Sequence, residues 1–372
     1  MKPQVREALR RSRARDFSFA QGRILGSMCT LPHPAAVEAF TQFMETNLGD
    51  PELFPGTQEL ECKAVERLGH WLHAPAGMGG RMTSGGTESN LTALWIFTSL
   101  TGKREVVVPQ HAHFSFAKAA SLMQVKIKDL PLRNQVADAR RLQQTLTPDT
   151  ACVVGVAGTT NLGLVDPIEE MSEMCREEHV PLHVDAAFGG LVIPFLRSLG
   201  KTERRFDFEL PGVSSVAVDP HKMGLSVIPS GMLLLREERW WEEIAVASAC
   251  THTQRQVSLL GTRPGGAAAA TYAVLEELGW EGYREVVRSC METTEYAVRM
   301  VEEAGFSLAA RPELNLLGVQ VTHPQEVAAR LSEKNWKVGV DPARGCIRIV
   351  CMPHVKKTLI DDFVSDLRSV TA

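Results

Sequence analysis

From about residue 81, short apolar segments alternate with helix-like ones, and this alternation constrains the fold more than any other feature of the chain. It is typical of a parallel sheet whose faces are covered by helices. The strand-like segments are rich in Val, Leu or Ile and end in polar, Gly or Pro turns; they cover residues 105–109, 125–130, 151–157, 181–185, 213–218 and 231–236. Helices are predicted at residues 88–100, 113–124, 168–179 and 239–246. We therefore expect an α/β protein.

The chain has 372 residues, enough for more than one domain. Residues 266 to about 305 predict one long or broken helix, interrupted at Gly279, that connects two domains. The predicted organisation is an N-terminal segment (1–60) that builds a substrate wall or a dimer contact, a large domain (61–265), the connecting helix (266–305) and a small α+β domain (306–372).

Charge and composition exclude several classes of protein. Forty Lys and Arg against 44 Asp and Glu give a net charge of -4, without the basic surface of a nucleic-acid binder. No apolar run reaches the roughly 18 residues that span a bilayer. Eight cysteines form no CxxC pair, so we expect reduced thiols in a cytoplasmic protein. The basic stretch 1–16 predicts a solvated helix, with a membrane or transit role as the alternative.

Polar clusters follow the predicted strands, where an open parallel sheet binds its ligands. In TSGGTESN (83–90), the N–H groups of Gly85, Gly86 and Thr87, with the hydroxyls of Ser84 and Thr87, could hold a phosphate at the start of a helix. Such a glycine-rich helix start can also be a purely structural turn.

Further side chains of chemical interest lie at the ends of three other predicted strands. Asp185 ends an apolar strand, where a carboxylate needs a cationic or hydrogen-bonding partner. Lys222 follows another strand, beside His221. His111 and His113 follow a third strand, and this pair allows either a zinc site or an imidazole stacked on a flat ligand.

Together these parts are those needed to hold pyridoxal phosphate. Lys222 would form an imine with its aldehyde, and Asp185 would keep the pyridine nitrogen protonated. His113 would stack on one ring face, and Ala187 is small enough to pack against the other.

The motifs TSGGTESN, AHFS, AGTTNLG, HVDAAFGG and DPHKMG, in this order, resemble the group II pyridoxal-phosphate-dependent amino acid decarboxylases of fold type I. The resemblance runs over nearly the whole chain. It implies a large domain with a mainly parallel, seven-stranded type of sheet and a small C-terminal α+β domain. Longer strings, including ETNLGDPELFPGT and LGTRPGG, are most similar to the archaeal members that make tyramine for methanofuran or β-alanine for coenzyme A.

The resemblance also implies roles for individual residues. Lys222 matches the Schiff-base lysine, Asp185 the partner of the pyridine nitrogen and His113 the stacking residue. Further matches are Gly86, Thr87 and His221 at the phosphate, Thr160 near the ring, Thr262 at the neighbouring subunit's phosphate and Arg348 at the substrate α-carboxylate. The match of Thr262 implies a homodimer with shared active sites.

The chain departs from the family at the proton donor, which in many relatives is a tyrosine on a loop after the lysine. No tyrosine lies between Lys222 and Gly261. His252 is our candidate donor, with Cys250 second, because an imidazole suits proton transfer near neutral pH. The alternative is an ordinary exposed histidine, and loss of the tyrosine also leaves room for an oxygen-dependent, aldehyde-forming side reaction.

The substrate remains open between L-tyrosine, slightly preferred, and L-aspartate. An aspartate pocket needs a second cation, for which Arg23, Arg255 and His33 are candidates, whereas a tyrosine pocket needs an apolar wall, as at 25–31 and 53–56. Two other functions are considered: a carbon–carbon lyase of the sphingosine-phosphate type, and a catalytically inactive regulatory homologue.

Overall fold

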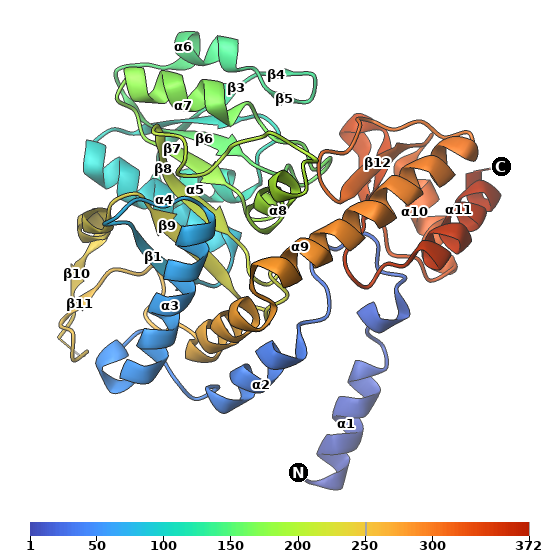
Figure 1. Cartoon of the computed structure of the whole chain (residues 1–372), viewed down its shortest axis with the longest axis horizontal. Coiled ribbons are helices and arrows are strands. Elements are labelled where there is room, and N and C mark those ends of the chain that lie inside the picture. The colour runs from blue at the N-terminus through green and yellow to red at the C-terminus, as the bar shows by residue number, and fades with distance from the viewer. Residues whose placement is uncertain (250, 372) are drawn as a thin grey trace. The chain divides into compact units, whose positions relative to one another are not determined.

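The computed structural model describes residues 1–249 and 251–371 of the chain (Figure 1). It divides into two compact units. The large unit comprises residues 32–288 and 312–314, and the small unit comprises residues 1–31, 289–311 and 315–372.

A seven-stranded sheet forms the centre of the large unit. Its spatial order is β1 (Gly79–Thr83), β9 (Gly231–Leu235), β8 (Val213–Val218), β7 (Leu182–Asp185), β6 (Thr150–Val156), β2 (Glu105–Pro109) and β3 (Lys126–Leu130). Neighbours from β8 to β3 pair in parallel, whereas β9 is antiparallel to both β8 and β1. Strand β1 therefore runs in the same direction as the five parallel strands.

The central strands are buried along their whole length, as expected of a sheet covered on both faces. Every residue of β2, β6 and β9 is buried. All six predicted strands are confirmed to within a residue at either end. The sequence analysis missed β1, because its sequence GGRMT lacks a run of β-branched residues.

The helices of the large unit lie around this sheet (Figure 1). They are α2 (Pro34–Gln42), α3 (Pro55–Trp71), α4 (Gly86–Thr101), α5 (Ser115–Met123), α6 (Leu142–Thr145), α7 (Ile168–Glu177) and α8 (Ile193–Ser198). Helix α4 is apolar on most sides, and its Leu94 and Phe97 share a core with Val106 and Val154 of the sheet. The predicted helix at 239–246 is instead a 3₁₀ helix, η5 (Glu238–Ile244). Its buried residues, Trp241 and Ile244, are three positions apart, the spacing that a 3₁₀ helix places on one side.

Short elements complete the large unit between its main strands and helices. They are the strand pairs β4 (Leu132–Arg133) with β5 (Val136–Ala137) and β10 (Val246–Ala247) with β11 (Arg255–Gln256), and the 3₁₀ helices η2 (Pro51–Leu53), η3 (Ala139–Arg141) and η4 (Gly189–Leu191).

Helix α9 (Gly265–Glu303) begins in the large unit and enters the small unit at Ser289. It is broken at Gly279, whose φ of 55° is left-handed, so the predicted interruption is confirmed.

The small unit contains an antiparallel sheet in the order β12 (Leu316–Gln320), β14 (Cys346–Val350) and β13 (Gly339–Asp341). Its helices are α1 (Pro3–Arg13), η1 (Phe19–Gln21), the end of α9, α10 (Pro324–Glu333), η6 (Pro342–Arg344) and α11 (Lys357–Thr371). Leu25 is fully buried in its core with Trp336 and Phe363. The predicted N-terminal segment 1–60 is therefore divided, because residues 1–31 belong with the C-terminal part of the chain.

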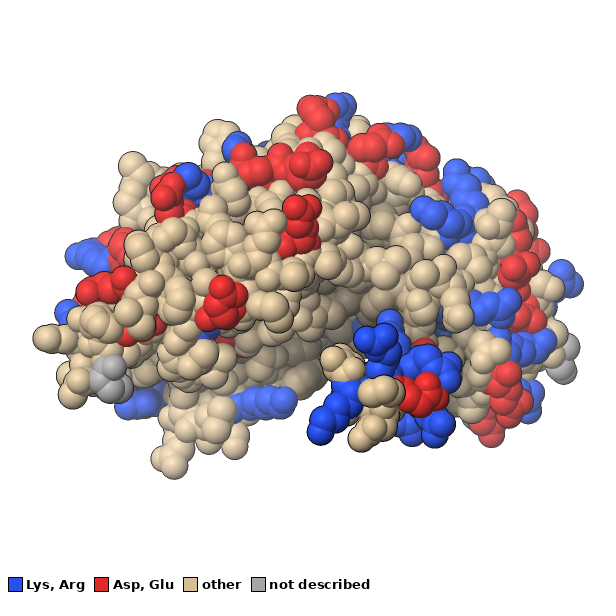
Figure 2. Space-filling view, turned by 90° about the horizontal axis from the view of Figure 1, so that it is seen from below, with Lys and Arg blue, Asp and Glu red and all other residues tan. Residues whose placement is uncertain are grey.

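Helix α1 has no buried residue, and its Glu7 pairs with Arg10 and Arg11. Lysine and arginine side chains gather where α1 lies, whereas both signs of charge are interspersed elsewhere on the face that Figure 2 shows. No helix among the described residues is both long and apolar enough to cross a membrane.

Candidate active site

Five loops meet at one edge of the large sheet. Since β1, β8, β7, β6 and β2 run in the same direction, their carboxyl ends lie along the same edge. The residues that follow these ends are the predicted ones: 84–87 after β1, 219–222 after β8, 185–187 at the end of β7, 158–160 after β6 and 111–113 after β2. The topology thus brings together segments that are up to about 140 positions apart in the sequence.

Lys222 lies in the turn after β8 with its ammonium group on a buried carboxylate. Its Nζ is 3.0 Å from Oδ2 of Asp219, and its backbone N–H donates to the Asp219 carbonyl at 2.9 Å. The Asp219 side chain is 3% exposed, and its Oδ1 is buried without a hydrogen-bond partner among the residues that the structure describes. This oxygen is an acceptor available to a bound molecule, because buried carboxylate oxygens are normally paired.

His221 packs beside this pair. Its Nδ1 accepts the backbone N–H of Ser230 at 3.2 Å, and its Nε2 is 3.6 Å from Asp219. Burial lowers the pKa of His221. Near neutral pH the imidazole is therefore neutral, with Nε2 as its donor.

Asp185 is held by two hydrogen bonds at the end of β7. Its Oδ1 accepts the backbone N–H of Ala187 at 3.1 Å, and its Oδ2 accepts from the Asn90 side chain at 2.8 Å. Both donors favour the ionised carboxylate. The motifs did not single out Asn90, although a buried asparagine in an apolar helix is a signal of a specific polar partner.

His113 lies among the charges of this edge. Burial is the main cause that lowers its pKa, and its charged neighbours include Asp185, Lys222 and Asp219. Its Nδ1 accepts the backbone N–H of Ser115 at 3.3 Å, which orients the ring. A neutral, oriented imidazole suits stacking on a flat ligand.

His111 does not share a role with His113. Its Nε2 is 2.8 Å from Asp166, and both side chains are buried. The side chains close enough to share a metal ion, among those that the structure describes, are instead His73, Asp207 and Glu209.

The loop after β1 approaches the loops after β7 and β8 closely. A Cβ on Gly86 would lie 3.1 Å from both Cβ of Ala187 and Oδ2 of Asp219, and one on Gly85, whose φ is 144°, would lie 3.0 Å from the His221 ring. Gly86 begins α4, a helix of 16 residues with free N–H groups at its start. The backbone N–H groups of Gly86 and Thr87 and the hydroxyls of Ser84 and Thr87 therefore fit a phosphate group, whereas the N–H groups of Ser84 and Gly85 donate to Glu88 Oε2, at 2.6 Å, and Thr83 Oγ1, at 3.4 Å. The lysine, carboxylate and imidazole fit the ring of pyridoxal phosphate.

The remaining predicted residues lie in different places. Thr160 is half-buried in the loop after β6, and Thr262 is exposed. Arg348 belongs to β14 of the small unit, where its guanidinium donates to the Gly26 carbonyl and burial lowers its pKa. Cys250 lies outside the described residues.

The His252 side chain is hydrogen-bonded to Asp50, the residue before η2. Its Nδ1 is 2.8 Å from Oδ2 of Asp50, and this hydrogen bond raises the pKa of His252. The three tyrosines lie elsewhere: Tyr283 is buried and donates to the Gly224 carbonyl at 2.7 Å, Tyr296 pairs with Asp361, and Tyr272 lines a surface pocket with Arg67 and Glu276.

Arg263, next to Thr262, is a buried residue that the sequence analysis missed. Its guanidinium pairs with both carboxylate oxygens of Glu61 on α3 and donates to the carbonyls of Leu48 and Met82. This ion pair fixes the loop that carries Thr262 to α3 and β1.

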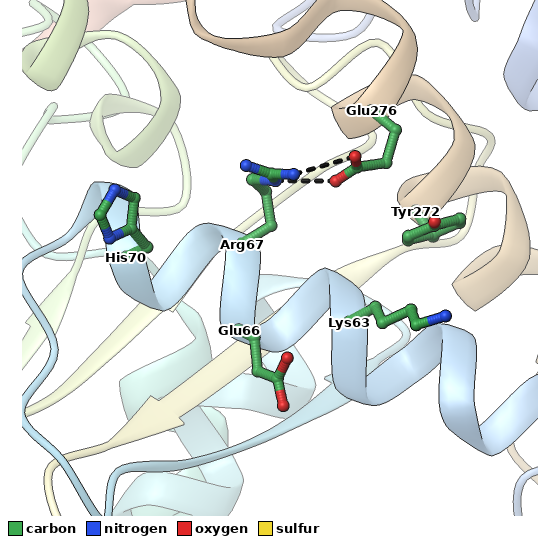
Figure 3. Close-up of a pocket in the computed structure, with 6 residues that line it drawn as sticks. All are labelled: Lys63, Glu66, Arg67, His70, Tyr272 and Glu276. Carbon is green, nitrogen blue, oxygen red and sulfur yellow. Dashed lines mark hydrogen bonds and ion pairs between the residues drawn. The ribbon is translucent and has the colours of Figure 1, made fainter.

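A separate pocket lies on the surface between α3 and α9 (Figure 3). The lysine and the arginine that line it are each paired with a carboxylate: Arg67 makes two hydrogen bonds to Glu276, at 2.7 and 2.9 Å, and Lys63 pairs with Glu59, on the same helix, at 2.5 Å. Neither cation could bind a phosphate without leaving its ion pair.

Comparison with known proteins identifies similar chains. Residues 33–321 match a family model described as "Pyridoxal-dependent decarboxylase conserved domain". A probable L-tyrosine/L-aspartate decarboxylase of Methanocella arvoryzae is 43% identical over 364 residues, covering 96% of this chain and 95% of the relative. A probable L-aspartate decarboxylase of Pyrococcus abyssi is 41% identical over 361 residues, covering 95% of this chain and 93% of the relative.

A solved structure, a sphingosine-1-phosphate lyase of Burkholderia pseudomallei, has a TM-score of 0.90 and 25% identity, covering 100% of this chain and 90% of that one. This likeness confirms the fold type that the sequence predicts.

Proposed function

The chain belongs to the pyridoxal-dependent decarboxylase family, and from this premise we propose that it removes the α-carboxylate of L-aspartate, L-tyrosine or both as CO₂. The products would be β-alanine and tyramine. L-aspartate occurs in the names of both relatives described above. The observation that carries the proposal is the convergence of Lys222, Asp185 and His113 at one sheet edge.

We assign roles to these side chains from their contacts. Lys222 would bond the aldehyde carbon of the cofactor through Nζ, which Asp219 would orient. Asp185 would stabilise the protonated pyridine nitrogen, and His113 and Ala187 would pack against the ring. When bound, pyridoxal phosphate accepts the electron pair released as the Cα–carboxylate bond breaks.

The phosphate is assigned to the N-terminus of α4, with Ser84, Gly85, Gly86, Thr87 and His221 around it. Backbone N–H groups and the helix dipole both favour an anion there. Thr160 is assigned to the ring, and Thr262 to the phosphate of a second subunit in a homodimer. The exposure of Thr262 and the rigid Arg263 beside it support that assignment.

Arg348 is proposed to bind the substrate α-carboxylate. Burial lowers the pKa of its guanidinium, but an arginine side chain stays charged in proteins. The three candidate second cations are engaged elsewhere. Arg23 donates to the Lys334 carbonyl, Arg255 pairs with Glu242, and His33 caps α2. An aspartate side chain would therefore need Arg255 to leave an exposed ion pair, which costs little.

We propose His252 as the group that returns a proton to Cα. The Asp50 carboxylate raises the pKa of His252, so a larger fraction of this imidazole is protonated near neutral pH than of an ordinary histidine. Because Nδ1 faces Asp50, the proton on Nε2 is the one that can be transferred. The predicted cytoplasmic location stays a prediction based on the cysteine usage.

The test is to incubate the purified, cofactor-loaded protein separately with L-aspartate, L-tyrosine and L-glutamate and to measure CO₂ and amine. Lys222→Ala is the control that should abolish both. β-Alanine or tyramine identifies the substrate. Absence of amine from all three, with the visible absorbance of lysine-bound cofactor intact, would contradict the decarboxylase proposal and favour a carbon–carbon lyase. Absence of that absorbance would favour an inactive homologue.

A further inference from the structure

A row of buried polar side chains leads from the centre of the sheet to Asp185. Ser215 on β8, His183 on β7 and Asn90 on α4 are each at most 1% exposed. His183 Nδ1 is 2.7 Å from the Ser215 hydroxyl, His183 Nε2 is 2.9 Å from Asn90 Oδ1, and Asn90 Nδ2 is 2.8 Å from Asp185 Oδ2. None of these three residues has a role in the proposed function.

The chemistry of the donors gives this row one direction. The Asn90 amide nitrogen must face Asp185, since the reverse orientation would place two acceptor oxygens together. The nitrogen also donates to the Ser115 hydroxyl, at 3.0 Å. Asn90 Oδ1 then requires a donor, so Nε2 of His183 carries the hydrogen. His183 Nδ1 is left as an acceptor for the Ser215 hydroxyl.

The imidazole in this row is neutral. Burial lowers the pKa of His183 to about 4, because the side chain is fully enclosed. A neutral histidine has only one ring N–H, and in His183 this N–H donates to Asn90 Oδ1. Every hydrogen from Ser215 to Asp185 therefore points towards the carboxylate, and aligned hydrogen bonds strengthen one another.

We propose that Asn90, His183 and Ser215 are positioning residues that hold the Asp185 carboxyl group in a fixed orientation towards the pyridine nitrogen of the cofactor. The proposal rests on the role given to Asp185 above. With Oδ2 held by Asn90 and Oδ1 by the Ala187 N–H, the carboxylate cannot rotate, and its remaining lone pairs are available to the ring.

The first test needs neither cofactor nor activity. In cofactor-free protein labelled with ¹⁵N-histidine, the His183 resonances, assigned with Ser215→Ala and His183→Gln, should show hydrogen on Nε2 and a bare Nδ1. They should not titrate between about pH 5 and pH 8, where an ordinary histidine does. Hydrogen on Nδ1, or titration in this range, would overturn the proposal.

The second test replaces Asn90 by an isosteric acid and uses cofactor affinity as its readout. The titratable groups that interact with Asp185 are His183 and His113, and His113 in turn interacts with the charges of Asp219 and Lys222. In Asn90→Asp the introduced carboxyl can donate to Asp185 only while it is protonated, and two adjacent carboxylates raise each other's affinity for a proton. Pyridoxal phosphate should therefore bind about tenfold or more weakly than to the unmodified chain at alkaline pH.

The ratio of the two dissociation constants should return towards one as the pH falls, since the neighbouring histidines titrate alike in both proteins. Thr98→Val is the matched control, because Thr98 is buried in the same helix and its hydroxyl donates to the Leu94 and Trp95 carbonyls of that helix. Its ratio should stay near one at every pH. A loss in Asn90→Asp that does not change with pH would mean packing damage and would overturn the proposal.

The two proposals fail separately. If the unmodified chain releases no amine while the resonances and the pH-dependent ratio are as expected, the decarboxylase proposal fails and the positioning row stands.

Discussion

The buried ion pair between Arg263 and Glu61 allows a quantitative prediction, because the chain contains a matched exposed pair. Both pairs join an arginine to a glutamate, and both involve α3. The Arg263 and Glu61 side chains are 7% and 5% exposed, whereas those of Arg67 and Glu276, in the pocket of Figure 3, are 42% and 36% exposed.

Arg263→Met should destabilise the large unit strongly. It leaves the Glu61 carboxylate buried without a cation and removes the donors of the Leu48 and Met82 carbonyls. Breaking a buried pair in this way costs about 3–5 kcal/mol. In a unit of this size, each kcal/mol shifts the melting temperature by about 2–4 °C, so a decrease of about 6 °C or more is expected.

Arg67→Met should have a much smaller effect, because an exposed pair contributes about 0–1 kcal/mol. The double variant Arg263→Met/Glu61→Leu should recover much of the stability lost in Arg263→Met, since no charge then stays buried. The assay is thermal unfolding of the four proteins without cofactor, at one scan rate and pH. Equal decreases in Arg263→Met and Arg67→Met, or no recovery in the double variant, would refute the reasoning.

Four further predictions concern the site and the buried side chains behind it. Gly86→Ala should weaken pyridoxal phosphate binding in an equilibrium titration, because the new Cβ would lie 3.1 Å from two neighbouring side chains; Gly56→Ala, where nothing lies within 4 Å, should not, and equal affinities would contradict the close approach. His252→Gln should slow turnover, and undiminished turnover would exclude His252 as the donor. Asp50→Asn should move the alkaline limb of the kcat profile to lower pH, because Asp50 raises the pKa of His252; an unmoved limb would contradict their coupling. The free energy of unfolding in urea should fall as the pH drops from about 6.5 to about 4, because the His183 side chain, whose pKa is about 4 in the folded chain, takes up a proton on unfolding. His183→Gln should reduce this pH dependence, and an unchanged pH dependence in that variant would contradict the explanation.

Most of the large sheet was predictable because its strands are short, apolar and separated by turn residues. Strand β1 was not, since glycine and arginine in GGRMT carry no strand signal and only the pairing with β9 makes it a strand. This omission matters, because the direction of β1 explains why residues 84–87, which follow it, lie at the same edge of the sheet as Lys222.

The candidate site was predictable where one short motif supplies one group, as for Lys222 and Asp185. The contacts that fix those groups were not, because they join residues far apart in the sequence. Asn90 and Asp185 are 95 positions apart, and Arg263 and Glu61 are 202 apart. A buried asparagine, histidine or arginine signals that a partner exists without saying which residue it is.

The small unit takes its core from both ends of the described chain, and this has a consequence for folding during synthesis. Residues 32–288 form a nearly continuous unit that can fold once they have left the ribosome. The partners of Leu25, by contrast, are made late: its backbone N–H donates to the Lys337 carbonyl and its side chain packs with Trp336 and Phe363. Leu25 therefore stays uncovered until more than 300 further residues have been made.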